Sequence, residues 1–328
     1  SISYDELMRK YSTIQSVYDR FSINDSEFES NMKSADSVKE LKELYQKGIA
    51  YMEEKNYPDA IEVFEEILKK SNNYPNVADK MSEAKSAYKQ QLMSQADEKI
   101  NSKDYSGALE ILEIGENYFT DDSTFSSKIT EVKNNVKNTA LSEAESAFST
   151  EGYQKSITII ETAISFCGEN EELTNALNKY KAYVPVNIVD IDPSETSRNN
   201  KVEKGETGVD NTNQTHKKNL YAFHRLYSQD DAYAVYPLMG KYDTLTFEAY
   251  RSNYDTSTDE SITIKIFGDN TELQSIVIDK GFNPNQYSID ISGVQKLKIV
   301  FESYDTNVFK QFDKLPGELA NVIVSKTK

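Results

Sequence analysis

The first half of the chain carries hydrophobic positions at helical spacing, and the pattern returns at a constant interval. Tyr57, Tyr105 and Tyr153 stand 48 residues apart, and each is followed by an apolar helical run. A period of about 20 to 50 residues is typical of arrays in which each unit buries its apolar face on its neighbours. The pattern therefore predicts an all-α array of helical hairpins over residues 1–183.

Each unit is expected to pair a long helix with a short one. No glycine or proline interrupts residues 76–101, which predicts a single helix of about 26 residues there. Small side chains let two helix backbones approach closely, because interiors are close-packed. We expect three small residues of the short helices to be buried where the two helices of a unit cross: Ala60, Ala108 and Ser156.

The first unit resembles the tetratricopeptide repeat. Gly48, Tyr51, Ala60 and Phe64 stand at that family's spacing of small, aromatic, small and aromatic positions. The period of 48 residues departs from the family's 34 residues, and the excess is itself helical in pattern.

The resemblance implies that a peptide ligand would lie against the first helix of each pair. The apolar residues that face this way are Tyr45, Met93 and Leu141, with Met52, Ile100 and Phe148 one and two turns further on. The alternative is that these columns pack helix on helix, which makes the array a rigid spacer.

From Val184 onward, apolar and polar residues alternate, as they do in half-buried strands. Pro185 lacks an amide hydrogen and biases the preceding residue away from helical angles, so helix should end near Tyr183 and strand should begin by Val186. The alternating stretches are 186–191, 245–249, 262–266, 276–278, 287–291, 297–301 and 320–324. Eight or nine short strands without helices predict an all-β antiparallel sandwich over 184–328.

Three stretches of this half resemble the NPCBM family of carbohydrate-binding modules. They are residues 238–245, residues 264–269, and residues 289–294 with the following 297–299. The resemblance covers essentially all of 184–328. It implies a jelly roll of the galactose-binding type, in an extracytoplasmic protein of a Gram-positive bacterium. The motif positions themselves are expected to be structural, with glycines at turns and aliphatic residues in the core.

A sugar site would have to use tyrosine, since the chain has no tryptophan. Tyrosine joins an apolar ring face to a hydrogen-bonding hydroxyl group. The loop 250–260 is the longest polar interruption between two predicted strands, and loops carry variable sites. The candidate ligand-binding residues are Tyr254, Arg251, Asp255, Tyr250, Tyr227 and Tyr304. The alternative is that these tyrosines pack on the sheet.

Charge limits the partners of the chain. The formal net charge is −17, which makes nucleic acid and anionic membrane surfaces poor partners. The sandwich half carries 21 of the 54 acidic and 16 of the 37 basic side chains, so the helical half is the more acidic. No apolar run approaches the roughly 20 residues that span a bilayer. Because the chain starts at Ser1, we expect that an export or anchoring segment has been removed.

No catalytic or metal motif is recognisable. The only cysteine, Cys167, excludes a disulfide framework, and we expect His216 and His224 to be ordinary polar residues. We therefore expect neither an enzyme nor a cofactor. Six acidic residues could supply oxygen ligands to a structural calcium ion, although they form no compact loop motif: Asp190, Asp192, Asp255, Asp259, Glu260 and Asp269.

Two functions fit the sequence. The first is a non-catalytic surface protein in which a helical-repeat stalk carries a carbohydrate-binding sandwich, with cell-wall or other glycans as partners. The second is a scaffold for protein assembly, in which the array binds a protein and the sandwich binds no sugar.

Overall fold

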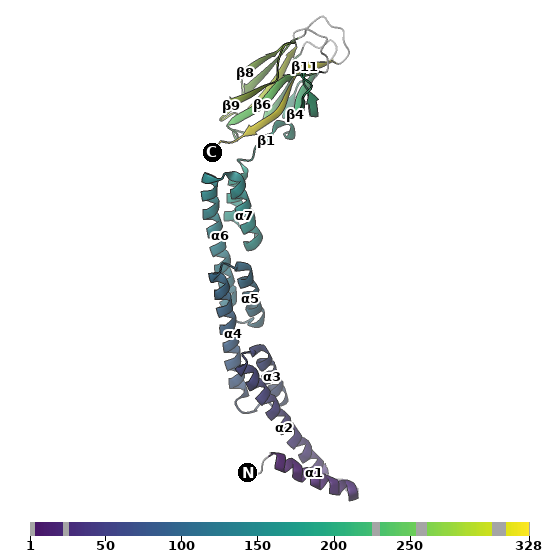
Figure 1. The fold of residues 1–328 in the computed structure, drawn as a ribbon, viewed down its shortest axis with the longest axis vertical. Helices are drawn as coiled ribbons and strands as arrows, with labels where there is room; N and C mark the ends of the chain where they lie inside the picture. Colours follow the sequence, from purple (N-terminus) through teal and green to yellow (C-terminus); the bar gives the residue numbers. More distant parts are fainter. Residues whose placement is uncertain (1–3, 22–25, 225–229, 254–260, 304–312, 328) are drawn as a thin grey trace. The chain divides into compact units, whose positions relative to one another are not determined.

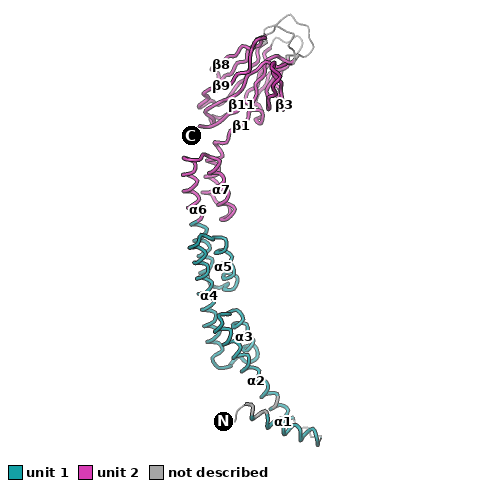
Figure 2. Tube along the Cα trace, in the orientation of Figure 1, with its two compact units in different colours: residues 1–135 teal, residues 136–328 magenta. Residues whose placement is uncertain are grey.

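The computed structural model describes residues 4–21, 26–224, 230–253, 261–303 and 313–327. Its contacts divide the chain into two compact units, residues 1–135 and residues 136–328 (Figure 2). No helix among the described residues is long and apolar enough to span a membrane.

The helical half alternates long and short helices (Figure 1). The helices are α1 (Tyr4–Phe21), α2 (Ser26–Glu53), α3 (Tyr57–Lys70), α4 (Val77–Asn101), α5 (Tyr105–Tyr118), α6 (Thr124–Thr150), α7 (Tyr153–Cys167) and α8 (Glu171–Lys181). The three tyrosines of the repeat are the first residues of α3, α5 and α7, and α4 has 25 residues. The predicted hairpins and the long uninterrupted helix are therefore confirmed.

The same backbone hydrogen bond closes each hairpin. The amide groups of Asn56, Asp104 and Gly152 each donate to the carbonyl oxygen of the residue five positions earlier, at 2.9 Å in all three cases. This bond satisfies a carbonyl group that the end of the long helix would leave without a partner. The 48-residue period of the sequence is thus a period of the backbone.

The small residues lie where the helices of a unit cross. Ala60, Ala108 and Ser156 are all 0% exposed, which confirms the predicted equivalence. In the third unit, the Ser156 hydroxyl group donates to the carbonyl oxygen of Ala144 on the facing helix, at 2.8 Å. The hydroxyl group can replace a methyl group at this buried place because it has an acceptor.

The second half is an antiparallel sandwich of two sheets. One sheet has the order β3-β4-β11-β6-β9, with β1 also paired to β11, and the other has the order β2-β5-β10-β7-β8. The strands are β1 (Val186–Asn187), β2 (Glu195–Thr196), β3 (Lys201–Val209), β4 (Thr215–His224), β5 (Ala232–Pro237), β6 (Thr244–Arg251), β7 (Ile262–Gly268), β8 (Thr271–Ile278), β9 (Asn285–Asp290), β10 (Lys296–Ser303) and β11 (Asp313–Ser325).

The core lies between the two sheets. Phe247 from the first sheet and Ile264, Ile299 and Phe301 from the second are buried in one cluster. The alternating stretches of the sequence supply these inward positions, so their assignment to strands is confirmed. The sequence analysis assigned no strand to residues 195–224 or 232–237, where β2 to β5 lie.

The boundary between helix and strand lies where Pro185 predicts it. The last helix ends at Lys181 and the first strand begins at Val186. The two compact units divide instead within α6, between residues 135 and 136. The division into domains 1–183 and 184–328 therefore stays a prediction.

Candidate functional site

The three stretches that resemble a carbohydrate-binding module meet at one end of the sandwich. The amide group of Gly240 donates to the carbonyl oxygen of Val294, and the carboxylate of Asp269 accepts the amide hydrogen of Lys296. Gly240 and Gly293 have φ of 65° and 77°, in the left-handed region that favours glycine. The structural role expected for these motif positions is confirmed, and a ligand site has to be sought elsewhere.

The outer face of the first sheet is covered by the β3–β4 hairpin. The hairpin tip reaches the end of β6, which is not a neighbour of either strand in the sheet. The amide group of Asn211 donates to the carbonyl oxygen of Arg251, and that of Asn253 donates to Val209, both at 2.9 Å. The polar side chains under the hairpin are therefore withdrawn from water.

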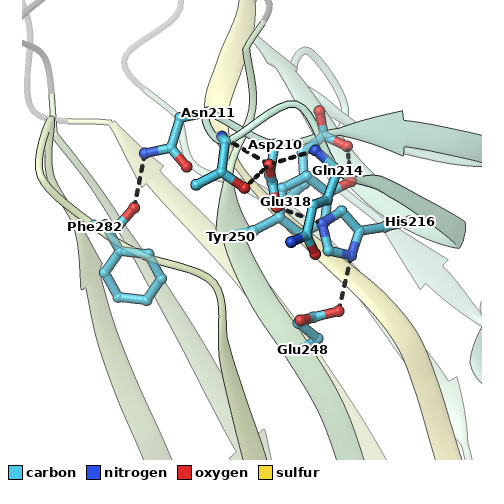
Figure 3. A network of polar contacts seen from close by, with 9 residues as sticks. Asp210, Asn211, Gln214, His216, Glu248, Tyr250, Phe282 and Glu318 are labelled. Atoms are coloured by element: carbon cyan, nitrogen blue, oxygen red, sulfur yellow. Dashed lines mark hydrogen bonds and ion pairs between the residues drawn. The ribbon is translucent and has the colours of Figure 1, made fainter.

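An imidazole group bridges two carboxylates under this hairpin (Figure 3). His216 Nε2 lies 2.8 Å from Asp210 Oδ2, and His216 Nδ1 lies 2.8 Å from Glu248 Oε2. Both hydrogen bonds form at once only when each ring nitrogen carries a hydrogen. The ring also stacks on Tyr250, with centroids 4.2 Å apart. With both nitrogens engaged, His216 has no position left for a metal ion or a substrate.

Asp210 organises the hairpin turn. Its Oδ1 atom accepts hydrogen bonds from the amide and hydroxyl groups of Thr212, both at 2.8 Å, and from the amide group of Gln214 at 3.0 Å. Burial by itself would raise the pKa of this carboxyl group. The hydrogen bonds from His216, Gln214 and Thr212 outweigh burial and lower the pKa to about 2. The carboxylate therefore stabilises the turn and holds His216 in place.

A second buried group lies beside the first. The hydroxyl group of Tyr250 donates to Glu318 Oε2 at 2.6 Å, and the side-chain amide of Asn219 donates to the same oxygen. The other oxygen, Oε1, forms an ion pair with Lys314. Burial, together with the negative charge of Glu318, raises the pKa of Tyr250. Asn219, Tyr250 and Glu318 are all 0% exposed, so these polar groups are a buried cluster.

Two of the predicted sugar-binding residues are described, and both are buried. Tyr250 is 0% exposed and Arg251 is 2% exposed, so neither offers its side chain to a ligand on an accessible surface. Burial follows from the β3–β4 hairpin, which the sequence analysis did not assign. Tyr254, Asp255, Tyr227 and Tyr304 lie outside the described residues. The binding role of the whole set stays a prediction.

The residues predicted to line a peptide groove are all half-buried: Tyr45, Met52, Met93, Ile100, Leu141 and Phe148. The ring of Tyr45 lies 5.7 Å from that of Tyr74, and the ring of Phe148 lies 4.7 Å from that of Tyr183. These contacts favour the packing alternative for both residues. A shallow hollow of about 680 Å³ lies along α4, one turn before Met93. Peptide binding to the array stays a prediction.

The residues proposed for calcium do not gather in the part of the chain that the structure describes. Asp190 pairs with Lys218 at 2.7 Å, and Asp192 pairs with Lys204 at 3.5 Å. Asp269 accepts backbone hydrogens at the motif end. Asp255, Asp259 and Glu260 lie outside the described residues. Within that described part, no group of three His, Cys, Asp or Glu side chains is placed to hold a metal ion.

The sequence analysis missed the polar cluster under the hairpin. It treated His216 as an ordinary polar residue, because no metal or catalytic spacing surrounds it. One local signal was present. Asp210 opens a run of Asn, Thr, Asn and Gln, and aspartate followed by such residues favours a turn in which its side chain accepts nearby backbone hydrogens. This signal predicts the hairpin turn, but it does not predict what the hairpin covers.

Comparisons with known proteins gave similarities to solved structures alone. No family model matches the chain, and no curated protein matches it. The CBM51 module of a Clostridium perfringens GH95 protein, in complex with methyl-galactose, is similar over 43% of this chain and 100% of that chain, with 14% identity and a TM-score of 0.35. The M60 catalytic domain structure of C. perfringens ZmpB, which includes two CBM51 domains, is similar over 44% of this chain and 15% of that chain, with 13% identity and a TM-score of 0.35. The tandem CBM51 modules of a Streptococcus pneumoniae family 98 glycoside hydrolase are similar over 44% and 47% respectively, with 9% identity and a TM-score of 0.34.

Proposed function

We propose that this protein is a non-catalytic carbohydrate-binding protein, in which the helical repeats carry a glycan-binding β-sandwich. One observation carries the proposal. The three stretches that resemble a carbohydrate-binding module come together, by backbone and carboxylate hydrogen bonds, at one end of an antiparallel sandwich. This is the arrangement that the resemblance implies, and it leaves the opposite end of the sandwich for recognition.

The strand ends that flank the predicted sugar-binding loops lie at that opposite end. Ile262, at the start of β7, pairs with Ser303, at the end of β10. Asp313, at the start of β11, pairs with His224, at the end of β4. Three chain segments thus leave and re-enter the sandwich close to one another. This convergence supports a shared site that includes Tyr254, Tyr227 and Tyr304.

The finer features belong to the same proposal. The sandwich is a jelly roll of the galactose-binding type, and the repeats are a long-period form of the tetratricopeptide type. The protein acts outside the cytoplasm, on the surface of a Gram-positive bacterium, where cell-wall or other glycans are its ligands. Its net charge of −17 suits a solvated stalk.

A glycan array probed with the full chain tests the proposal. We expect binding to a limited set of glycans, and isothermal titration of the best ligand should give a measurable Kd. Tyr254→Ala, Tyr227→Ala and Tyr304→Ala should weaken this Kd at least tenfold in one or more cases, because a stacked ring contributes about 1 kcal/mol or more. Tyr233→Ala is the matched control, since the Tyr233 ring face is already covered by Lys298 Nζ at 4.1 Å.

Two results would contradict the proposal at different levels. If no glycan binds while the full chain captures a protein partner, the scaffold function replaces the carbohydrate-binding one. If a glycan binds and all three alanine variants keep the wild-type affinity, carbohydrate binding stands and the predicted site is wrong.

A further inference from the structure

The buried cluster under the β3–β4 hairpin places an amine beside a primary amide. Lys314 lies at the start of β11, and Asn219 lies on the adjacent strand β4. Both side chains contact the same carboxyl group, that of Glu318, and they contact different oxygens of it. The ammonium group of Lys314 faces Oε1, and the Nδ2 atom of Asn219 donates to Oε2. The carboxyl group therefore lies between a nucleophile and the nitrogen that would leave the amide.

The surroundings of this trio are dry. Asn219 and Glu318 are 0% exposed, and the Lys314 side chain is 16% exposed. The hairpin backbone closes the site at Gly208, where an added Cβ would collide with the hydroxyl group of Tyr250, the carboxylate of Glu318 and the amide of Asn219. Because no side chain fits there, the strand itself is the lid.

The position of each reacting group is fixed by a neighbour. The Lys314 ammonium group lies 4.4 Å from the centroid of the Tyr221 ring, which directs the side chain along the strand towards Glu318. Tyr250 donates to Glu318 and holds its carboxyl plane. The Oδ1 atom of Asn219 is buried and has no hydrogen-bond partner among the described residues. A buried amide oxygen without a partner is costly in a purely structural cluster.

We propose that Lys314 and Asn219 form an intramolecular amide bond, with Glu318 as the proton carrier. Glu318 takes a proton from the Lys314 ammonium group, a transfer that a low-dielectric site favours because it removes two charges. The neutral amine attacks Cγ of Asn219. Glu318 then gives its proton to Nδ2, the C–Nδ2 bond breaks, and ammonia leaves. One C–N bond forms and one breaks, so no oxidant, reductant or co-reactant is required.

The bond would join β4 to β11 across the irregularity that interrupts their pairing between Lys314 and Glu318. It would fasten the β4–β11 pair, and with it the hairpin that β4 shares with β3. This function is independent of glycan binding, so the two proposals can fail separately.

Intact mass spectrometry of the full chain tests the bond. We expect most molecules to be lighter than the sequence mass by one ammonia, about 17 Da. Tryptic digestion should then give one linked species that joins residues 219–225 to residues 311–326, uncleaved after Lys314.

Two variants separate the reaction from folding. Lys314→Arg keeps the positive charge beside Glu318 but removes the nucleophilic amine, and Glu318→Gln keeps the shape but removes the proton carrier. Both should fold, as judged by circular dichroism, and both should show the full sequence mass. The proposal is overturned if the wild-type chain has the full mass, or if the loss of ammonia persists in Lys314→Arg without linked peptides, since that result indicates a succinimide at an asparagine.

Discussion

Replacement of Asp210 by asparagine tests whether the imidazole-bridged cluster holds the hairpin. The pKa of this carboxyl group falls from its ordinary 3.8 to about 2 in the folded chain. That difference corresponds to about 2 kcal/mol of stability, since one pKa unit is about 1.4 kcal/mol. A lowered pKa stabilises the fold above the unfolded value, and the contribution is lost as pH falls from about 4 to about 2. Asp210→Asn should therefore cost about 2 kcal/mol at pH 7 and about 1 kcal/mol at pH 3.

Urea unfolding of the full chain at pH 7, 4 and 3 measures the difference, with tyrosine fluorescence as the signal. Asp290→Asn is the matched control. Asp290 accepts the same pair of hydrogen bonds, from the amide group of Ser292 at 2.9 Å and its hydroxyl group at 2.6 Å, but it is exposed and has no imidazole partner. We expect its replacement to change stability by less than about 0.5 kcal/mol. An Asp210→Asn effect no larger than the control, or one that does not shrink below pH 4, would refute the reasoning.

Three further changes test the packing of both halves. Ala108→Leu should destabilise the repeat array by about 1–3 kcal/mol through overpacking, measured by thermal unfolding, and an unchanged Tm would contradict the helix crossing at this position. Gly208→Ala should cost a similar amount, because its methyl group would meet the Tyr250 hydroxyl group, and a neutral effect in urea unfolding would show that the hairpin lies differently. Burial, and then the hydrogen bond to Glu145, raise the pKa of Tyr180 to about 12. The stabilisation is complete below the unfolded value near 10 and is lost as pH rises towards 12, so Tyr180→Phe should lose less stability than wild type over that range, and equal losses would argue against it.

The helical half was predictable because its information is local and repeated. The 48-residue period fixed where α3, α5 and α7 begin, and the absence of glycine and proline fixed the length of α4. The crossing positions Ala60 and Ala108 followed from size alone, since only a small side chain fits between two close helices. The sequence also determined the inward faces of the long alternating strands, because a half-buried strand requires that alternation.

The tertiary structure alone decided the fate of the polar residues in the sandwich. Strand β3 is an edge strand with mostly polar side chains, so no alternation marks it in the sequence. Its hairpin covers the outer face of a sheet, and this turns Tyr250, Arg251 and Glu318 from expected surface residues into buried ones. Residues 99 positions apart, Asn219 and Glu318, meet only because β4 and β11 are neighbours. Long-range pairing leaves no trace in local spacing, so the charge partners of a buried polar group are set by the fold.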